Sequence, residues 1–414
     1  MKKHTKRFLA LFLAMAMLIC SSCGKAPAGE EQEAPAPVEE EQQQETPDTE
    51  SQPDAEAPGS TASAGGDYEA FDNYPHPVVK TDGALTIGFV SDKPEFESIQ
   101  RILQQLRLEC IHRGWDLVEV VYESEQDLRD KILNLINQNV DVILNFSLTN
   151  MDSKQDLVAQ ARNAGIGWYN MDTQVVDGVI SNSAMPDGLA GATLMYAIGE
   201  KSKWNEGIAV ITKKSIQVHY ERTDVMSAIA SCYSTASVLS EQDIAAVTYD
   251  ELQAANDFAK TWVTQYGDQL TGIITSTDYF GVPVAEALNQ AGVENVWVSG
   301  FDGGSETWSY IRNNTPLQYS YAVPDELFVH MALEVIEDIQ VEGMNPGDEG
   351  CTISHVGEIM YCEGIVIDRD NCPDVGTNIH AVFDYYGGDP ADEDAWYNWN
   401  DGDGAYVVTD YVAE

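Results

Sequence analysis

The sequence predicts an α/β protein with two parallel sheets, each covered by helices on both faces. Three observations support this class. Predicted strands and helices alternate from residue 84 onward, a second alternating series begins near residue 183, and residues 272–304 read as one complete strand–loop–helix–strand unit. A helix that connects two strands implies parallel pairing, because the chain must return across the sheet.

The two series divide the chain into strands of four to seven residues. We expect strands at 85–90, 116–121, 140–146 and 166–171 in the first series, and at 208–211, 236–239, 272–276, 296–299 and 317–322 in the second. Helices with apolar residues on one face separate these strands. A last helix begins at Pro324, and proline is well tolerated in the first turn of a helix.

The unit at 272–304 carries the first candidate site residues. Its helix has one apolar face and ends at Gly292, where the backbone must turn left-handed. We expect residues 277–279 to form a loop. Asp278 and Asp302 follow the two strands of the unit, and ligands of open α/β sheets bind at the carboxyl ends of the strands.

Residues 1–22 have the pattern of an export signal. Four basic residues precede an apolar stretch at 8–19, which is too short to span a bilayer as a helix. Small residues precede Cys23, as in the processing site of bacterial lipoproteins, which this segment resembles. We therefore expect a lipid anchor on Cys23 and a protein held outside the cytoplasm at the cell membrane. A plain secretory signal is the alternative.

Residues 23–80 are rich in Glu, Pro, Gln and Ser and contain almost no apolar residue before Tyr68. Such a segment cannot bury a core, so we predict a disordered linker. Self-repelling charge and proline extend it. We expect it to hold the folded part away from the membrane.

Acidic residues outnumber basic ones by 68 to 22, which gives a formal net charge of −46. This balance excludes nucleic acid as a partner, because phosphate binding needs clustered Lys and Arg. Anionic membrane surfaces are disfavoured for the same reason. We expect contact with the membrane through the lipid anchor only.

Five cysteines follow Cys23. Cys110 continues an apolar helix face, so we expect a buried thiol. Cys351, Cys362 and Cys372 lie close together in an exported chain, and the sequence leaves one disulfide among them open. None of them is spaced as a zinc-binding pair.

Motifs for catalysis are missing from the sequence. It has neither a Gly-x-Ser-x-Gly turn nor a phosphate-binding glycine loop, and its histidines lack metal-ligand spacing. We expect no enzyme, no cofactor and no metal site. The acidic, aromatic tail at 386–414 resembles a calcium loop only loosely, so we expect a solvated tail whose tryptophans can pack onto a lobe.

Two halves of this kind in tandem resemble the type I periplasmic binding proteins, the group that binds ribose, galactose and xylose. The motifs that carry the resemblance are LTIGFVSDKPEFE at 85–97, QNVDVILNF at 138–146, AGIGWYNMD at 164–172, ERTDVMSAI at 221–229, and ITSTDYFGVPVAEALNQAGV with VSGFDG at 274–303. The resemblance covers about residues 84–375. It implies two Rossmann-like lobes with a three-strand hinge: 81–183 plus 323–355, and 184–322 plus 356–385.

The resemblance also implies a ligand cleft between the lobes. The residues that match the family's ligand contacts are Phe96, Asp172, Arg222, Asp278, Tyr279 and Asp302. Carboxylates accept hydrogen bonds from sugar hydroxyls, arginine donates in a fixed fork, and aromatic rings stack on the apolar face of a sugar.

Three of these residues have a structural alternative. Asp302 could cap the following helix, Asp278 could be a solvated acid or a helix cap, and Phe96 could belong to the core. Lys93 and Thr173 also differ from the residues common in the ribose-binding group. We therefore expect a different pentose, hexose, polyol or sugar-like ligand.

The function implied by the resemblance is a monomeric solute-binding lipoprotein that delivers a carbohydrate-like ligand to an ABC permease. The alternative is a sensor module that presents its ligand state to a receptor kinase or chemoreceptor. An exported enzyme on this fold is disfavoured.

Overall fold

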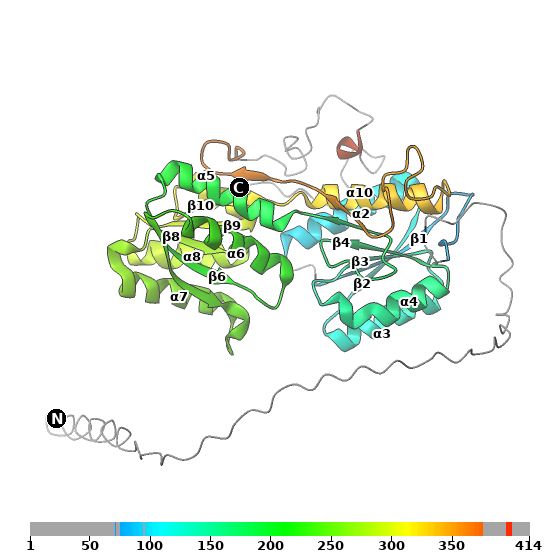
Figure 1. Cartoon of the computed structure of the whole chain (residues 1–414), viewed down its shortest axis with the longest axis horizontal. Coiled ribbons are helices and arrows are strands. Elements are labelled where there is room, and N and C mark those ends of the chain that lie inside the picture. Colours follow the sequence, from blue (N-terminus) through cyan, green and yellow to red (C-terminus); the bar gives the residue numbers. More distant parts are fainter. Residues whose placement is uncertain (1–70, 72–74, 94–95, 376–394, 400–414) are drawn as a thin grey trace, which may run out of the picture. The chain divides into compact units, whose positions relative to one another are not determined.

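The computed structural model of the chain describes Phe71 and residues 75–93, 96–375 and 395–399. The predicted export signal, Cys23 and most of the acidic tail lie outside the described residues. Within them, two six-stranded sheets form two α/β lobes (Figure 1). No described helix is long and apolar enough to cross a membrane.

The sheet of the first lobe has the strand order β11-β5-β4-β3-β1-β2, and every neighbouring pair is parallel. Its strands are β1 (Thr86–Ser91), β2 (Asp116–Val121), β3 (Val142–Phe146), β4 (Gly167–Met171), β5 (Ser181–Ala184) and β11 (Glu358–Tyr361). Its helices are α2 (Glu97–Arg113), α3 (Glu125–Asn137), α4 (Gln155–Asn163) and α10 (Asp325–Gln340).

The sheet of the second lobe has the order β12-β10-β9-β8-β6-β7, in which only the edge strand β12 is antiparallel to its neighbour. Its strands are β6 (Glu206–Thr212), β7 (Ala236–Asp243), β8 (Gly272–Thr275), β9 (Trp297–Asp302), β10 (Leu317–Ala322) and β12 (Ile365–Ile367). Its helices are α5 (Asp187–Ser202), α6 (Gln217–Ser231), α7 (Glu251–Tyr266), α8 (Asp278–Ala291) and α9 (Ser305–Arg312).

The alternation of side chains along β6 explains why helices cover both faces of the second sheet. Ile208 and Val210 pack into the core that contains residues of α5 and α6. Ala209 and Ile211 point the other way, into the core beneath α7 and α8. Every one of these side chains is fully buried, as expected for a parallel strand covered on both faces. The predicted fold class is confirmed.

The chain passes between the two sheets three times, after β5, after β10 and after β11. Two expected lobe boundaries need correction. The boundary at residues 183–184 falls inside β5, because Ala184 still pairs with Tyr361. The boundary at residue 356 came too early, since β11 adds to the edge of the first sheet and only β12 joins the second. A short edge strand carries too little periodicity to be assigned to a sheet from sequence.

The expected linker ends earlier than residue 80. Phe71 is buried in the core of the first lobe and meets the ring of His76 edge-on. The backbone of Val78 donates to Gly165, and that of Lys80 donates to Gln340. Apolar residues return to the sequence at this point, so the segment can bury surface and the prediction of disorder up to residue 80 was wrong.

Part of the aromatic tail lies on the first lobe. The ring of Trp399 stacks on His112 of α2 at a centroid distance of 3.7 Å, and Trp396 stacks on His330 of α10 at 4.5 Å. The guanidinium of Arg113 lies 5.9 Å from the centre of the Trp399 ring. The packing of tail tryptophans thus covers the surface where α2 meets α10.

The cysteines of the described region are free thiols. Cys110 is buried as expected. Cys351, Cys362 and Cys372 form no disulfide with one another, which answers the question that the sequence left open.

The close approach of α5 and α6 depends on Gly191. A Cβ atom at this position would lie 2.4 Å from the carbonyl oxygen of Arg222. We expect Gly191→Ala to lower the free energy of unfolding by about 1–3 kcal/mol, because the two helices must move apart. Chemical denaturation followed by circular dichroism measures this change.

Gly188, one turn earlier in α5, is the matched control. A Cβ there would meet only a methyl group of Val225 at 3.5 Å, which is ordinary contact. Gly188→Ala should leave stability unchanged or raise it by up to about 1 kcal/mol, since alanine favours helix. Equal losses from the two variants would contradict the packing argument.

Candidate functional site

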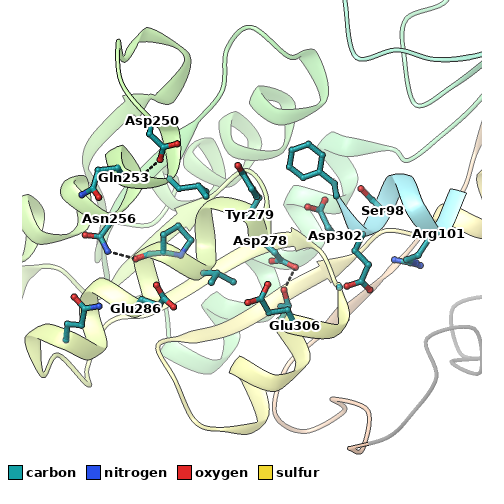
Figure 2. Close-up of a pocket in the computed structure, with 18 of the residues that line it drawn as sticks. Ser98, Arg101, Asp250, Gln253, Asn256, Asp278, Tyr279, Glu286, Asp302 and Glu306 are labelled. Carbon is teal, nitrogen blue, oxygen red and sulfur yellow. Dashed lines mark hydrogen bonds between the residues drawn. The ribbon is translucent and has the colours of Figure 1, made fainter. Parts of the chain in front are cut away.

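The carboxyl ends of strands from both lobes border a cleft of about 640 Å³. Five of the six predicted site residues line it: Phe96, Asp172, Arg222, Tyr279 and Asp302. Asp278 lines an adjoining groove that shares Phe96, Tyr279 and Asp302 with the cleft (Figure 2). The structure therefore brings together residues that are up to 206 positions apart in the sequence.

Arg222, in α6, is the centre of this site. Its Nε donates to Asp187 Oδ1 at 2.6 Å, and its Nη1 lies 3.6 Å from Asp302 Oδ1. Its Nη2 lies 4.0 Å from Asp172 Oδ2. Arg222 is almost fully buried, and its guanidinium lies 5.1 Å from the centre of the Phe301 ring. One cation thus faces carboxylates from the ends of β4 and β9 and from the start of α5.

Asp187 is the partner that the sequence analysis missed. It is buried at the first turn of α5, directly after the first crossing between the lobes. An acid that follows Pro186 at a helix start was the available signal. That position more often stabilises the helix dipole than binds an arginine, so only the tertiary structure identifies its role.

Burial changes the acidity of the carboxylates around Arg222. Burial, together with repulsion from Asp187, raises the pKa of Asp172 to about 7, against the attraction of Arg222. Burial likewise raises the pKa of Asp302 to about 6, although Arg222 and Arg101 oppose the rise. Loss of hydration is the dominant cause in both residues. The Asp302 side chain keeps 32% of its surface exposed.

Asp172 and Asp302 also have unusual backbones. Their φ angles are 45° and 105°, in the region that side chains other than glycine rarely adopt. Such conformations cost about 1–3 kcal/mol and concentrate at functional sites. Both residues end a strand at the cleft, so the strain fixes two carboxylates on the rims of opposite lobes.

Several buried polar atoms at the cleft have no hydrogen-bond partner among the described residues. They are Asp172 Oδ1, Thr149 Oγ1 and Thr277 Oγ1. A buried polar atom without a partner costs about 1–3 kcal/mol. The three residues that carry these atoms line the same cleft.

Asp278 differs from these residues: its Oδ1 is also without a partner, but its Oδ2 is held by the second lobe. It begins α8 rather than lying in the expected loop, and it is buried. Its Oδ2 accepts hydrogen bonds from the backbone N–H of Gly303 and from the hydroxyls of Thr307 and Ser320, all within 2.9 Å. The carboxylate therefore joins the start of α8 to β10 and α9.

Burial and the neighbouring Asp302 raise the pKa of Asp278 well above its usual value. Asp278 is therefore bonded within the internal structure of the second lobe. A loop was predicted at 277–279 because the apolar periodicity of the helix begins only at Val284. The three donors to Asp278 could not be recognised in the sequence, because they follow it by 25 to 42 positions.

Phe96 and Tyr279 meet across the cleft. Their ring centroids are 5.0 Å apart in an edge-to-face arrangement, and each residue remains about 40% exposed. Phe96 precedes α2 in the first lobe, and Tyr279 lies in α8 of the second. The two rings therefore form an aromatic wall between the cleft and the adjoining groove.

Two polar contacts also join the lobes. The Glu97 carboxylate accepts from the backbone N–H of Ser305 at 3.0 Å and from its hydroxyl at 2.9 Å, so an acid of the first lobe caps α9 of the second. On another part of the interface, Gln174 Nε2 donates to Gln217 Oε1 at 2.5 Å. The lobes thus touch at more than one place along the cleft.

A second buried cation supports the floor of the site. Arg101 Nε and Nη2 donate to the two carboxylate oxygens of Glu326 at 2.8 and 2.6 Å, and Nη1 lies 3.0 Å from Asp325 Oδ2. Both acids open α10, directly after the second crossing between the lobes. The sequence analysis missed this cluster, because an arginine inside an apolar helix face gives no sign of its partner 225 residues away.

Comparison with known proteins gives one family match. A family model described as a periplasmic binding protein domain matches residues 113–335. A xylitol-binding protein of Mycolicibacterium smegmatis is 27% identical over 193 residues, which are 45% of this chain and 54% of that protein. The chain thus spans about half the length of this curated relative.

Solved structures show the same fold. An ABC transporter solute-binding protein from Mycobacterium smegmatis with bound glycerol has a TM-score of 0.60 and 17% identity, over 70% of this chain and 96% of that one. A solute-binding protein from Bacillus halodurans with bound myo-inositol has a TM-score of 0.59 and 14% identity, over 71% and 98%. The arabinose-binding component from Shewanella sp. ANA-3 has a TM-score of 0.60 and 16% identity, over 69% and 92%.

The strain at Asp302 is testable by itself. Asp302→Gly removes the side chain and relaxes the backbone, whereas Asp302→Ala removes the carboxylate and keeps the φ of 105°. We expect the glycine variant to be the more stable of the two by about 1 kcal/mol, the reverse of the usual order. Denaturation in urea compares them, and an alanine variant at least as stable as the glycine variant would rule out the strain.

Proposed function

The chain belongs to the family of periplasmic binding protein domains, and from this premise we propose that it captures a sugar or polyol in the cleft between its lobes. The observation that carries the proposal is the Arg222 cluster with the partner-free Asp172 Oδ1 beside it. The fork of Arg222 donates to hydroxyl oxygens, and the carboxylates of Asp172 and Asp302 accept from hydroxyl hydrogens. A ligand with neighbouring hydroxyls satisfies both.

The charge around the cleft supports an uncharged ligand. Its lining includes six acids, Asp92, Glu125, Asp172, Glu251, Asp302 and Asp325, and only two cations, Lys213 and Arg222. Lys213 is paired with Glu251 at 2.9 Å, and Arg222 is paired with Asp187. A sugar phosphate or sugar acid would find both cations of the described lining already paired, and an anion left without a partner is costly in a buried site.

The relatives named above support the same ligand class. The ligands of these relatives are xylitol, glycerol, myo-inositol and arabinose, which are uncharged and carry several hydroxyls. The aromatic wall of Phe96 and Tyr279 offers a surface for the apolar face of such a molecule.

The contacts between the lobes support capture by closure. Glu97 with Ser305, Gln174 with Gln217, and Phe96 with Tyr279 join segments of different lobes around the cleft. Closure of two domains around a ligand is a common switching geometry. We further propose that a lipid on Cys23 anchors the protein outside the cytoplasm, and that it acts as a monomer that delivers its ligand to an ABC permease rather than as an enzyme.

Isothermal titration of the purified chain with xylitol, myo-inositol, pentoses and hexoses tests the ligand class. We expect at least one uncharged member to bind with micromolar or better affinity, and its phosphate ester to bind at least 100-fold more weakly. Asp172→Asn should weaken binding about tenfold or more, since a hydrogen bond to a charged group is worth about 1.5–3 kcal/mol. Asp177→Asn is the matched control, because Asp177 is exposed at the surface.

Binding of none of these compounds would sink the carbohydrate proposal and leave the fold intact. Equal binding of a sugar and its phosphate would contradict the charge argument. Release of a chemically altered ligand after incubation would indicate an enzyme in place of a binding protein.

The raised pKa of Asp172, about 7, predicts opposite effects of pH on stability and on binding. In the ligand-free protein this acid favours the protonated form, so its contribution to stability is present at low pH and is lost as the pH rises through about 7. Ligand hydroxyls donate to the ionised form, so binding should release a proton near neutral pH. Affinity should fall about tenfold between pH 7.5 and pH 5.5.

Titration calorimetry in buffers of different ionisation enthalpy measures the released proton, and thermal unfolding across the same range measures stability. Asp172→Asn should remove most of the pH dependence of affinity and of stability near pH 7. Proton uptake on binding, or an affinity independent of pH, would contradict this assignment.

A further inference from the structure

The cleft is larger than a single sugar. Its volume is about 640 Å³. A hexose has about 12 non-hydrogen atoms, and even at about 30 Å³ for each, the share of a whole water molecule in the liquid, it would fill at most ~360 Å³. Contacts already join the lobes at Glu97 and Ser305 and at Gln174 and Gln217. The cleft therefore leaves room for a ligand larger than a hexose even though the lobes already touch.

The wall next to Asp172 is apolar. Leu148 of the first lobe and Ile216 and Val218 of the second line the cleft, and together with Asp172 they also border the hollow beside it. Phe146, at the end of β3, adds a further apolar side chain to the cleft. These residues form a patch, here called the apolar subsite, that is continuous with the carboxylate end of the cleft.

Several polar side chains that line the cleft or the hollow beside it are already paired inside the protein. The Tyr122 hydroxyl donates to Asp92 Oδ2 at 2.6 Å, and Lys213 is paired with Glu251 at 2.9 Å. In the first lobe, Thr173 Oγ1 donates to the carbonyl of Ser147, which joins the loops after β3 and β4.

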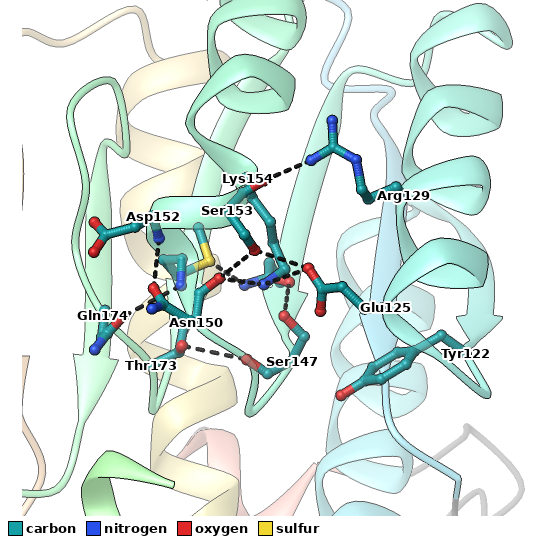
Figure 3. A network of polar contacts seen from close by, with 12 residues as sticks. Tyr122, Glu125, Arg129, Ser147, Asn150, Asp152, Ser153, Lys154, Thr173 and Gln174 are labelled. Carbon is teal, nitrogen blue, oxygen red and sulfur yellow. Dashed lines mark hydrogen bonds and ion pairs between the residues drawn. The ribbon is translucent and has the colours of Figure 1, made fainter. Parts of the chain in front are cut away.

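The loop after β3 is held by a hydrogen-bond network (Figure 3). Asn150 Oδ1 accepts from the backbone N–H of Asp152, its carbonyl accepts from Lys154 Nζ at 2.8 Å, and Gln174 Oε1 accepts from the backbone N–H of Met151. Lys154 is fully buried. The network fixes the loop that carries Leu148, so the first-lobe part of the apolar subsite is preformed, and Ile216 and Val218 complete it from the second lobe.

These two halves of the cleft suit different chemistry. Hydroxyl groups find acceptors and donors at Asp172, Arg222 and Asp302. Against Leu148, Ile216 and Val218 a hydroxyl would lose its water and gain few partners, which is unfavourable, whereas an apolar group gains by burial. Among the described side chains of residues 147–150, Thr149 Oγ1 is the one buried polar atom without a partner.

We propose that the preferred ligand is a sugar that carries an apolar substituent, such as an aryl glycoside, a thioether sugar or a nucleoside. This inference rests on the function proposed above. The sugar hydroxyls contact Asp172, Arg222 and Asp302, and the substituent lies against Phe146, Leu148, Ile216 and Val218. The acids of the cleft exclude a charged phosphate at either end.

Matched probes test the proposal by titration calorimetry on the full chain. D-xylose is compared with phenyl β-D-xyloside, and D-galactose with phenyl β-D-galactoside. Xylobiose and lactose serve as controls of similar size in which the substituent is polar. We expect the phenyl glycoside of the preferred sugar to bind at least tenfold more tightly than the free sugar, and the disaccharide to bind no more tightly than the free sugar.

A variant of the apolar subsite tests the location. Ile216→Thr should reduce the ratio of the two dissociation constants, free sugar to phenyl glycoside, at least threefold. Ile111→Thr makes the same change on the exposed side of α2 and should leave the ratio unaltered. A ratio that is the same in both variants would overturn the assignment to this wall.

The outcomes separate this inference from the proposed function. Binding of free sugars with no preference for the phenyl glycosides overturns the apolar subsite and leaves the sugar site standing. A disaccharide that binds as tightly as the phenyl glycoside also overturns it, because the wall would then accept hydroxyls. Binding of no probe here, together with no binding of xylitol, myo-inositol or the other pentoses and hexoses, overturns both proposals.

Discussion

The ion cluster at Arg222 is the interaction on which the site depends. One buried guanidinium faces Asp187 at the start of α5, Asp302 at the end of β9 and Asp172 at the end of β4 in the other lobe. A buried charge is stable only when its partners are close and correctly oriented. The positions of both sheet ends and of α5 therefore follow from the need to pair this cation.

Close packing around the cluster explains several features of the sequence that look unrelated. Gly191 allows α5 to touch the backbone of Arg222, and Gly300 leaves room for the carboxylate of Asp278, which would lie 2.2 Å from a Cβ atom. Gly303 has a positive φ and no space for a side chain beside Ala322. The Gly-Phe-Asp-Gly motif thus presents Asp302 to the cleft while its two glycines let β9 approach α8 and β10.

The site combines residues that were predictable with residues that were not. The position of strand ends in the sequence predicted that Asp278 and Asp302 share one edge of the second sheet, whereas Asp172 and Arg222, in different lobes, were predicted from the resemblance to the binding-protein family. Asp278 had the same signal, yet its Oδ2 is occupied by three donors of the second lobe. Local pattern locates a carboxylate at a strand end, but only packing decides whether protein donors already surround it.

The sequence by itself determined the α/β class, the order of nine strands with helices between them, and the strand ends that carry Asp278 and Asp302, because these depend on periodicity and on the direction of parallel strands. The short strands β5, β11 and β12 were not predicted. The tertiary structure decided the rest. It assigned β11 to the first sheet, paired Arg222 with Asp187 and Arg101 with Glu326, placed Phe71 in the core, and set an apolar wall beside Asp172. These features join residues that are distant in the chain, and their energies depend on burial and geometry that no local pattern encodes.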